Sequence, residues 1–517
     1  MDNGSAYIKG YFFLSNQNNN FGKERILSYL SAVRDTHDFI GKLRNLNGNY
    51  SIIVKNINKT YIAVDRVRSI PLFFSILDNE FYISDSIDSI KKMTGINKIN
   101  KWSSIEFEQT GYVTLSNTLY DNIYQVQAGE CIVIDHSQNQ MNFNRYRYYD
   151  FLHKVGSTYK IGELFSLMDY SINNVFRRLD QSTKNKTLVV PLSGGLDSRL
   201  IISNIHKIGR KNVLCFFYGR KNSREELVSK SIARELSYNW VSVEYTKKKW
   251  NECFNDGSFA KYFRYAGNGS SLPHIQDFLA IKELKNRSLL PENSVFIPGH
   301  TGDFISGGHI PNMHNLSNIN KESLVNSIID KHYILWIIKN YPHFSIINKY
   351  ITSRVKHALK SHDIISKNDL ANIFENWEWK ERQSKFIINS CRVYEFYGFE
   401  WRLPLWDLEF INYWSRIPLE MRENKKLYKE YLLNSNYKNL FSDFNYKNFE
   451  KNNFKSFFKK TSIAKYLLSI YNRYYAYYHF SYNGMVKFSQ LLSIYRFRYN
   501  INSIMIVYYL KMLNKDK

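Results

Sequence analysis

Cysteine is scarce in this sequence, which has four in 517 residues: Cys131, Cys215, Cys253 and Cys391. They lie far apart, and no two of them form a CxxC pair. Zinc sites and disulfide frameworks use closely or regularly spaced cysteines, so we expect neither. So few thiols are typical of a protein in a reducing compartment.

Long apolar runs are also missing. The longest late run, "IMIVYYL" from Ile504, is far shorter than the ~20 residues that a membrane helix needs. The N-terminal stretch "MDNGSAYIKGYFF" has no basic segment followed by a long apolar run, so it does not resemble a secretory signal. We therefore expect a cytoplasmic protein without a transmembrane segment.

Acidic residues are few relative to basic ones, and the formal net charge is +25. One interpretation is a polyanionic partner such as nucleic acid or a membrane surface. The other is a compositional habit, because lysines are scattered along the chain and no nucleic-acid motif accompanies them. We favour the second interpretation and expect no nucleic-acid partner.

The length and the changing pattern predict more than one domain. Up to about residue 150, short β-branched and aromatic runs such as "NYSIIV" and "KTYIAV" predict antiparallel β layers in an α+β domain. From about 160, apolar strands alternate with amphipathic helices, which predicts an α/β domain with a parallel sheet. Beyond about 310 the pattern is mostly helical. We expect domains at 1–150 and 160–435, and an aromatic, basic helical extension at 436–517.

The extension allows two interpretations. Its sequence "YLLSIYNRYYAYYHF" is rich in aromatic and basic residues, as a helix on a membrane surface would be. Tyr and Phe nevertheless occur on all helical faces, which favours helices that pack on the body of the protein.

The stretch "VVPLSGGLDSRLIISNI" (189–205) carries the strongest chemical signal. A buried strand ends at Ser193-Gly194-Gly195, and a helix follows with Asp197 and Ser198 in its first turn. Helix N-termini and bare glycine backbone bind phosphates, and a nearby carboxylate suits Mg²⁺. The loop is shorter than a Walker A loop and has no GK[ST] sequence, so it does not predict γ-phosphoryl transfer.

This string resembles the pyrophosphate loop of the ATP-pyrophosphatase superfamily, and two later segments resemble those of asparagine synthetases. "VFIPGHTGDFISGG" keeps Gly299, Asp303, Gly307 and Gly308 of one family loop. "GFEWRLPLWDLEFINYWSRIPLEMRENKKLYKEYL" is similar to a family helix and lysine segment, with its matched positions at Glu400, Arg402, Pro404, Asp407, Lys425 and Lys429. Lys429 stands where the family has an arginine.

The resemblance implies that an adenylating site uses ATP and Mg²⁺. Asp197 and Asp303 would bind the metal and pyrophosphate. Glu225 and Glu226 lie near an acidic pair of the family, as a looser match. The nucleotide contacts would come from Leu192, Ser193, Gly194, Gly195, Asp197, Ser198, Tyr218, Pro298, Gly299 and Lys429. The catalytic group would be Lys425, Asp303, His300, Glu400 and Arg402. Lys425 is alternatively a surface lysine, and Glu400 with Arg402 a structural ion pair.

Residues 46–90 resemble the glutaminase half of the same family, through "LNGNYSIIV", "YIAVDRVRSIPLFF" and "FYISDSIDSI". That half uses an N-terminal cysteine as nucleophile, whereas Asp2 follows Met1 here and the first cysteine is Cys131. The covalent route to ammonia needs that thiol. We therefore expect a degenerate glutaminase-like domain without glutaminase activity.

Two departures lie in the synthetase segment. His300 replaces an acidic residue, and it adds a group that titrates near pH 7 and is a candidate base for an amine; its alternative is a hydrogen-bonded loop histidine. Phe304 replaces a glutamate, which removes a charge expected near the reacting centre and argues against aspartate as substrate.

We therefore expect an ATP- and Mg²⁺-dependent ligase that adenylates a small-molecule or peptide carboxylate and transfers an amine or ammonia to it. Three alternatives stay open. They are an asparagine synthetase that receives ammonia from solution or from a partner, an enzyme of sugar-acid amidation or of peptide or β-lactam-type cyclisation, and a nucleotide-binding module without catalysis.

Overall fold

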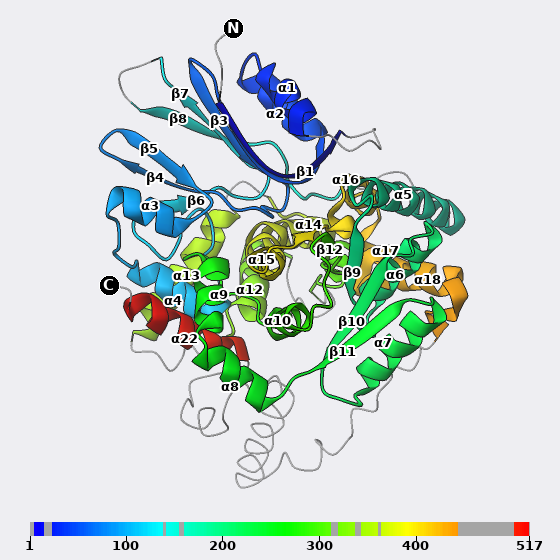
Figure 1. Ribbon diagram of the computed structural model, residues 1–517. Helices are drawn as coiled ribbons and strands as arrows, with labels where there is room; N and C mark the ends of the chain where they lie inside the picture. Colours follow the sequence, from blue (N-terminus) through cyan, green and yellow to red (C-terminus); the bar gives the residue numbers. More distant parts are fainter. Residues whose placement is uncertain are drawn as a thin grey trace, which may run out of the picture.

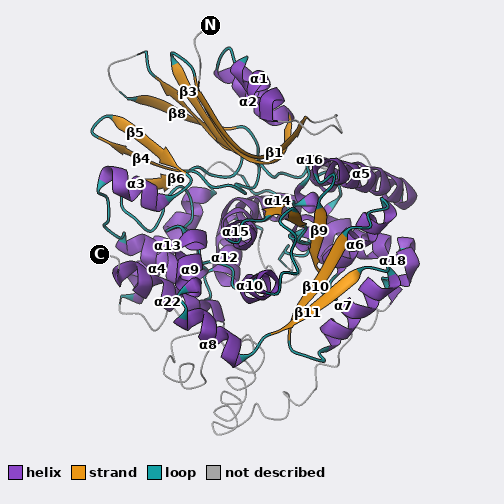
Figure 2. Cartoon of the chain, viewed as in Figure 1, coloured by secondary structure: helices purple, strands orange, loops and turns teal. Residues whose placement is uncertain are grey.

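A computed structural model gives the arrangement of the chain (Figure 1 and Figure 2). It describes residues 5–14, 23–137, 141–154, 160–311, 319–336, 343–359, 363–442 and 501–515. Within them, no helix combines the length and the apolar character needed to cross a membrane. The predicted extension lies largely outside the described residues.

The first part of the chain forms two antiparallel β layers. The larger sheet has the order β1-β2-β3-β7-β8, and the smaller has the order β5-β4-β6. Their bounds are β1 Ser5–Leu14, β2 Leu46–Lys55, β3 Lys59–Val64, β4 Phe73–Leu77, β5 Glu80–Ser84, β6 Ile123–Gln125, β7 Glu130–Asp135 and β8 Asn142–Arg147. The predicted antiparallel architecture is confirmed.

Successive strand residues point to opposite sides of a sheet. The continuous apolar runs of β2, β3 and β7 therefore make both faces of the larger sheet apolar. Helices α1 (Lys23–Ser31) and α2 (Thr36–Asn45) cover one face, where Phe39 packs on Tyr61. On the other face Ile62 and Ile132 pack with Phe74 of the smaller sheet. Helix α3 (Ile87–Thr94) lies beside the smaller sheet, and α4 (Lys101–Thr110) lies next to the C-terminal helix.

The second part is built on a parallel sheet of order β11-β10-β9-β12-β13, as the alternating pattern predicts. Its strands are β9 Thr187–Pro191, β10 Val213–Gly219, β11 Asn239–Glu244, β12 Ser294–Phe296 and β13 Glu400–Trp401. A parallel sheet is buried on both faces, which explains continuous apolar runs such as "TLVVP". Figure 1 shows the helices on both sides: α5 Ile161–Ser182, α6 Leu196–Lys207 and α7 Arg224–Glu235 on one, and α10 Phe278–Asn286 and α15 Arg392–Phe396 on the other.

One local expectation is wrong. The segment beginning at Glu400 was expected to be helical, but Glu400–Trp401 form the edge strand β13, paired with Val295 and Phe296. Pro404 follows three residues later and begins a short 3₁₀ turn, Pro404–Trp406. The residue before a proline disfavours helical backbone, so a helix cannot run through Leu403.

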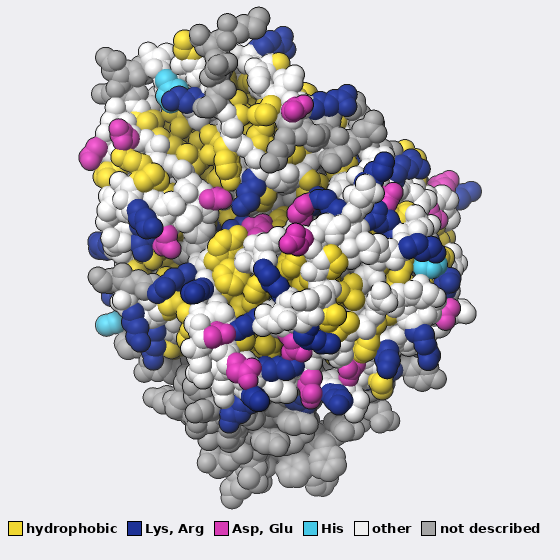
Figure 3. Space-filling model, in the orientation of Figure 1, with side chains coloured by type: hydrophobic (Ala, Val, Ile, Leu, Met, Phe, Trp, Pro, Cys, Tyr) yellow, Lys and Arg dark blue, Asp and Glu magenta, His cyan; other side chains and the backbone are white. Residues whose placement is uncertain are grey.

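Three further helices precede residue 310: α8 Lys247–Asn255, α9 Ser258–Gly267 and α11 Gly302–Ile305. Beyond it the described residues are mostly helical, as expected, with α12 Lys321–His332, α13 Phe344–Ala358, α14 Lys367–Glu378, α16 Leu408–Trp414, α17 Leu419–Arg422, α18 Lys426–Ser435 and α22 Ile501–Lys515. A π-helical turn, Trp379–Ile387, continues α14. On the face in Figure 3, Lys and Arg side chains lie interspersed with Asp and Glu.

Candidate active site

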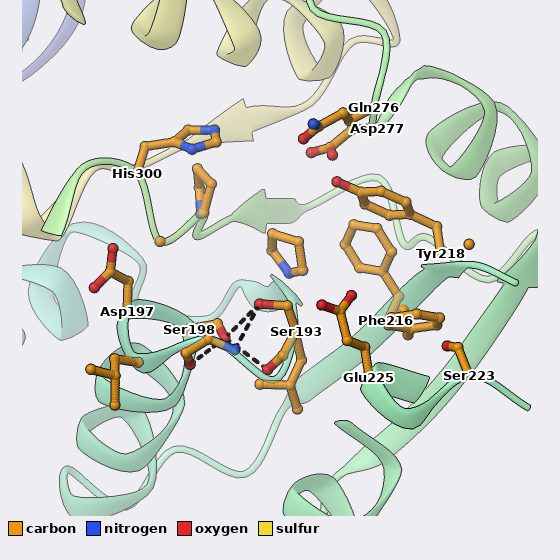
Figure 4. Close-up of a pocket in the computed structure, with 18 of the residues that line it drawn as sticks. Ser193, Asp197, Ser198, Phe216, Tyr218, Ser223, Glu225, Gln276, Asp277 and His300 are labelled. Atoms are coloured by element: carbon orange, nitrogen blue, oxygen red, sulfur yellow. Dashed lines mark hydrogen bonds between the residues drawn. The ribbon is translucent and has the colours of Figure 1, made fainter. Parts of the chain in front are cut away.

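A cavity of about 940 Å³ opens where the strands of the parallel sheet end. Ligands of open α/β sheets bind at the carboxyl ends of the strands, and here the loops after β9, β10 and β12 meet. Figure 4 shows the side chains around it. The predicted site residues that line it are Leu192, Ser193, Gly195, Asp197, Ser198, Tyr218, Pro298, Gly299, His300, Asp303 and Lys425, together with Glu225.

The loop between β9 and α6 is tightly folded on its own polar groups. Ser198 Oγ donates to Ser193 O at 2.9 Å and lies 3.1 Å from Ser193 Oγ, and Gly195 N–H donates to Ser193 Oγ at 3.2 Å. The residue before α6, Gly195, has no capping side chain. The first-turn N–H groups of α6 therefore lack intrahelical acceptors and favour an anion in front of them.

Gly194 has no structural need to be glycine. Its φ angle is not positive, and a Cβ added there would meet nothing nearer than Val228, at an ordinary 3.6 Å. A bare backbone can press against phosphate oxygens, so this loop is suited to an anion.

The glycines of the facing loop serve protein packing instead. A Cβ on Gly302 would lie 2.5 Å from Asp197 Oδ1, and one on Gly299 would lie 3.1 Å from Ser198 N. Both positions must be bare for the loop after β12 to approach the start of α6. This approach puts the two aspartates together.

Asp197 and Asp303 form a close pair whose charges are only partly compensated. Asp197 accepts hydrogen bonds from Tyr428 Oη at 2.9 Å and from Asp303 N–H at 3.1 Å. Burial and then the charge of Asp303 raise the pKa of Asp197 to about 7. Mg²⁺ is commonly held by one or two carboxylates plus phosphate oxygens, so this pair fits the metal. Within the described residues, no cluster of three or more His, Cys, Asp or Glu side chains could hold a metal by itself.

Lys425 reaches the same pair from the turn between α17 and α18. Its Nζ forms an ion pair with Asp303 Oδ1. Asn424 and Lys425 both have left-handed backbone, with φ of 55° and 62°. Such conformations are unusual for residues with side chains and cluster at functional positions. A Cβ on Gly308 would lie 2.9 Å from Lys425 Cδ, so that glycine leaves room for the lysine side chain.

His300 also lines the cavity but does not titrate near pH 7. Its Nε2 lies 2.7 Å from Ser390 Oγ, and its ring centroid lies 6.5 Å from that of His274. Burial lowers the pKa of His300 to about 4, although the charge of Asp277 opposes this. The expected titration near neutrality is therefore wrong, and His300 is a neutral, hydrogen-bonded imidazole at pH 7.

Residues 177–440, just over half of the chain, match the asparagine synthase family. The chain belongs to this family. Every residue that lines the cavity, from Pro191 to Lys425, lies within the matched segment. The microcin J25-processing protein McjC of Escherichia coli is 23% identical over 272 residues, which cover 51% of this chain and 48% of that protein. The chain thus spans about half the length of this relative.

Solved structures match it only distantly. An NH3-dependent NAD synthetase from Campylobacter jejuni has 14% identity and a TM-score of 0.19, covering 40% of this chain and 83% of that one. An NMN synthetase from Francisella tularensis has 12% identity and a TM-score of 0.21, covering 43% and 95%. A glutamine PRPP amidotransferase from B. subtilis has 10% identity and a TM-score of 0.21, covering 47% and 71%. Such scores establish no shared fold.

Some predicted members of the asparagine synthase site are not among the residues that line the cavity. They are Lys429, Glu400 and Arg402, and also Gly194, although its neighbours Ser193 and Gly195 do line it. Arg402 donates to Glu400 Oε2 at 2.8 Å and to Trp401 O at 2.9 Å, and its guanidinium lies 4.4 Å from the ring centroid of Tyr11. Because β13 pairs with β12 before the loop that carries Gly299, this ion pair lies along the sheet rather than at its carboxyl edge. This placement agrees with the alternative interpretation of Glu400 and Arg402 as a structural ion pair.

Phe304 and Glu226 face away from the cavity as well. Phe304 is fully buried and packs on Phe151 and Trp406, with ring centroids 5.1 and 6.0 Å away. Its apolar side chain belongs to the hydrophobic core and does not lie at the expected reacting centre. Glu226 is buried and accepts hydrogen bonds from the Asn222 N–H and the Ser242 hydroxyl.

The cavity also has walls that sequence reasoning missed. They are Pro191, Leu196, Phe216, Phe217, Gly219, Arg220, Ser223, Tyr245, Gln276 and Asp277. Several could have been found, because Phe216, Phe217 and Tyr245 end predicted strands of the parallel sheet. The ring of Tyr245 stacks on that of Tyr218 at 5.3 Å. No motif marks Gln276 and Asp277, which precede α10.

Proposed function

We propose that this protein is an ATP- and Mg²⁺-dependent ligase that forms an amide bond by adenylating a carboxylate. The observation that carries the proposal is Gly194 at the carboxyl end of β9, a glycine without a packing role, beside the Asp197, Asp303 and Lys425 cluster. Membership of the asparagine synthase family supports it. ATP is the substrate of this site.

The reaction has two balanced steps. A carboxylate oxygen attacks the α-phosphorus of ATP, the bond to the β-phosphate oxygen breaks, and pyrophosphate leaves. An amine nitrogen or ammonia then attacks the acyl carbon and loses a proton, and the bond from that carbon to AMP breaks. Negative charge grows on the departing pyrophosphate, so a cation fixed nearby lowers the barrier.

The chain supplies that cation and the loop that orients the phosphates. The first turn of α6 and the Ser193–Gly195 backbone bind the outer phosphates, and Lys425 stabilises the leaving pyrophosphate. Asp197 and Asp303 would hold Mg²⁺, which neutralises phosphate charge when bound. The stacked rings of Tyr218 and Tyr245 offer an aromatic wall for the adenine.

We also propose that the N-terminal β layers are a glutaminase-like domain without glutaminase activity. All four cysteines are buried. Cys131, the earliest of them, lies in β7, and burial raises the pKa of its thiol to about 12. A thiol that is protonated at neutral pH is a poor nucleophile. Ammonia from solution or a substrate amine would then feed the second step.

The test is pyrophosphate release and ATP–pyrophosphate exchange with aspartate, uronic-acid sugars and peptides as carboxylates. Peptides are included because the Escherichia coli relative is named for processing microcin J25. AMP and pyrophosphate are the expected products. ADP and phosphate would refute the proposal, and ATP binding without pyrophosphate release across the panel would favour a non-catalytic nucleotide-binding module.

Replacing Lys425 tests its role in this reaction. Lys425→Ala should lower kcat by about 10²–10³-fold, as removal of one preorganised charge donor typically does. Lys426→Ala is the matched control, since Lys426 is the exposed next residue and does not line the cavity. Unchanged turnover in Lys425→Ala would remove that lysine from the mechanism.

A further inference from the structure

Asp277 is a carboxylate on the cavity wall to which the proposed chemistry gives no role. It directly precedes α10 and is 6% exposed, yet it borders the cavity. Figure 4 shows it beside Gln276, towards the ring of Tyr218 and away from Asp197 and Ser198. It thus lies in a different part of the cavity from the two carboxylates that would hold the metal.

The contacts that Asp277 makes among the described residues are with hydroxyl, imidazole and thiol groups. Tyr394 Oη donates to Asp277 Oδ2 at 2.5 Å. His274 and His300 are near enough to feel its charge, but burial lowers the pKa of each. Tyr262, Tyr394 and Cys391, whose pKa values the carboxylate of Asp277 also affects, have raised pKa values and are neutral. Among the described residues, no lysine or arginine forms an ion pair with Asp277.

Such a carboxylate is costly without a counter-charge. Aspartate is almost never this buried unless it is paired, because desolvation of an ion costs several kcal/mol. The N-terminus of α10 and the hydroxyl of Tyr394 offset part of that cost. A cation that enters the cavity would supply the rest.

We propose that Asp277 binds the ammonium group of the nucleophile, at the wall of the cavity opposite the phosphate loop. This inference rests on the proposed function, in which an amine or ammonia displaces AMP. The ligand is a primary alkylammonium or the ammonium ion itself, which share the N⁺–H donors that a carboxylate accepts. A divalent metal fits poorly, since Asp277 is a single carboxylate and no cluster of three metal-ligating side chains occurs among the described residues.

Glu225 provides a matched comparison within the same cavity. It also lines the cavity, but it is exposed. Water screens an exposed carboxylate, so an ion pair there contributes little. A buried carboxylate such as Asp277 binds an alkylammonium more strongly, provided that the cation keeps its hydrogen bonds.

The experiment titrates the full-length protein with n-butylammonium chloride and with ammonium chloride, and follows the thermal midpoint. Tetramethylammonium chloride, which has no N–H donor, controls for ionic strength. Wild type and Glu225→Gln should show a saturable rise with at least one of the two N–H cations. In Asp277→Asn the apparent Kd should weaken about tenfold or more, the usual effect of losing a charge-assisted hydrogen bond.

Tyr394→Phe separates binding from a purely structural role. It keeps the Asp277 carboxylate and frees Oδ2, so it should bind the ammonium probe at least as tightly as wild type. If Asp277 only anchors Tyr394, the wild-type protein would show no response to the ammonium probes, and neither variant would show one. Loss of the response in Tyr394→Phe would likewise overturn the proposal. This second variant keeps the test decisive if Asp277→Asn does not fold.

A parallel titration with ATP distinguishes the two proposals. ATP stabilisation of every variant, with equal responses of wild type and Asp277→Asn to the amines, would refute the ammonium site and leave the proposed function intact. Failure of ATP to stabilise wild type would instead count against the proposed function. A response to ammonium alone would support the site and identify free ammonia as the donor, whereas a butylammonium response would identify a substrate amine.

Discussion

Adding a methyl group at Gly194 should weaken ATP binding while leaving the stability of the free protein almost unchanged. The Gly194→Ala side chain would meet only Val228 at 3.6 Å and would sit at an ordinary φ angle, so the free protein should lose less than ~1 kcal/mol of stability. ATP binding should weaken at least about tenfold, because the methyl group would occupy space next to the phosphate oxygens. Thermal midpoints with and without ATP measure both effects.

Gly307→Ala is the opposite control. Gly307 has φ of +88°, and its added Cβ would lie 2.5 Å from Arg422 O, so this substitution should destabilise the free protein. Tight ATP binding by Gly194→Ala would mean that the triphosphate lies elsewhere.

Asp197 gives the molecule a pH dependence whose sign follows from its pKa. The pKa rises from 3.8 to about 7 on folding, so the native state binds the proton more tightly than the unfolded state. This group therefore stabilises the fold less as pH rises from about 4 to 7, and the loss is complete above 7. Asp197→Asn lacks the ionised form and should exceed wild type by ~1–3 kcal/mol at pH 8.

Urea unfolding at pH 5 and pH 8, without metal or nucleotide, measures that difference. Asp256→Asn should change stability in the opposite direction at pH 8. Burial opposes ionisation of Asp256, but hydrogen bonds from Lys282 and Ser258 hold its pKa at about 2. An advantage of Asp197→Asn that is equal at both pH values would contradict the raised pKa.

At the level of elements, the strands and helices of the parallel sheet could be predicted from the sequence. The spacing of apolar residues and the positions of glycines depend only on nearby residues of the chain. The edge strand β13 was missed because Glu400–Trp401 is two residues long and is defined by its pairing with Val295 and Phe296. A motif match likewise predicted that Glu400 and Arg402 belong to the site. Only the register of β13 shows that they lie along the sheet.

Residues that enter the cavity from unpatterned segments were equally hidden from the sequence. Asp277 follows no strand, and Lys425 occupies a left-handed turn whose position depends on α17 and α18. Phe304 shows the converse limit. Its place in a motif suggested the reacting centre, whereas its contacts with Phe151 and Trp406 come from segments far away in sequence.

Across the whole molecule, the β layers and the parallel sheet are joined by polar contacts as well as by a shared core. Trp379 Nε1 donates to Arg66 O at 2.8 Å, and Asn47 Nδ2 donates to Asp407 Oδ2 at 2.9 Å. The buried Lys385 ammonium donates to Leu115 O at 2.5 Å. The N-terminal layers therefore stabilise the part of the chain built on the parallel sheet, whether or not they carry any chemistry.

The C-terminal helix α22 joins this assembly through Tyr509. The ring is fully buried against Phe107 of α4 and Phe263 of α9, with centroids 5.7 and 6.2 Å away. Its hydroxyl accepts a hydrogen bond from Gly269 N–H at 2.9 Å, a few residues before the cavity wall at Gln276. The described end of the chain thus packs on the body of the protein.

Tyr509→Ala should therefore cost about 3–5 kcal/mol of stability, the usual price of emptying a large aromatic site, and Tyr509→Phe about 1 kcal/mol for the lost hydrogen bond. Lys511→Ala, at an exposed position of the same helix, should change stability by less than ~0.5 kcal/mol. Urea unfolding compares the three variants with wild type. If Tyr509→Ala were as stable as Lys511→Ala, α22 would not be part of the folded core, and association of that helix with a membrane surface would become the better account of its aromatic residues.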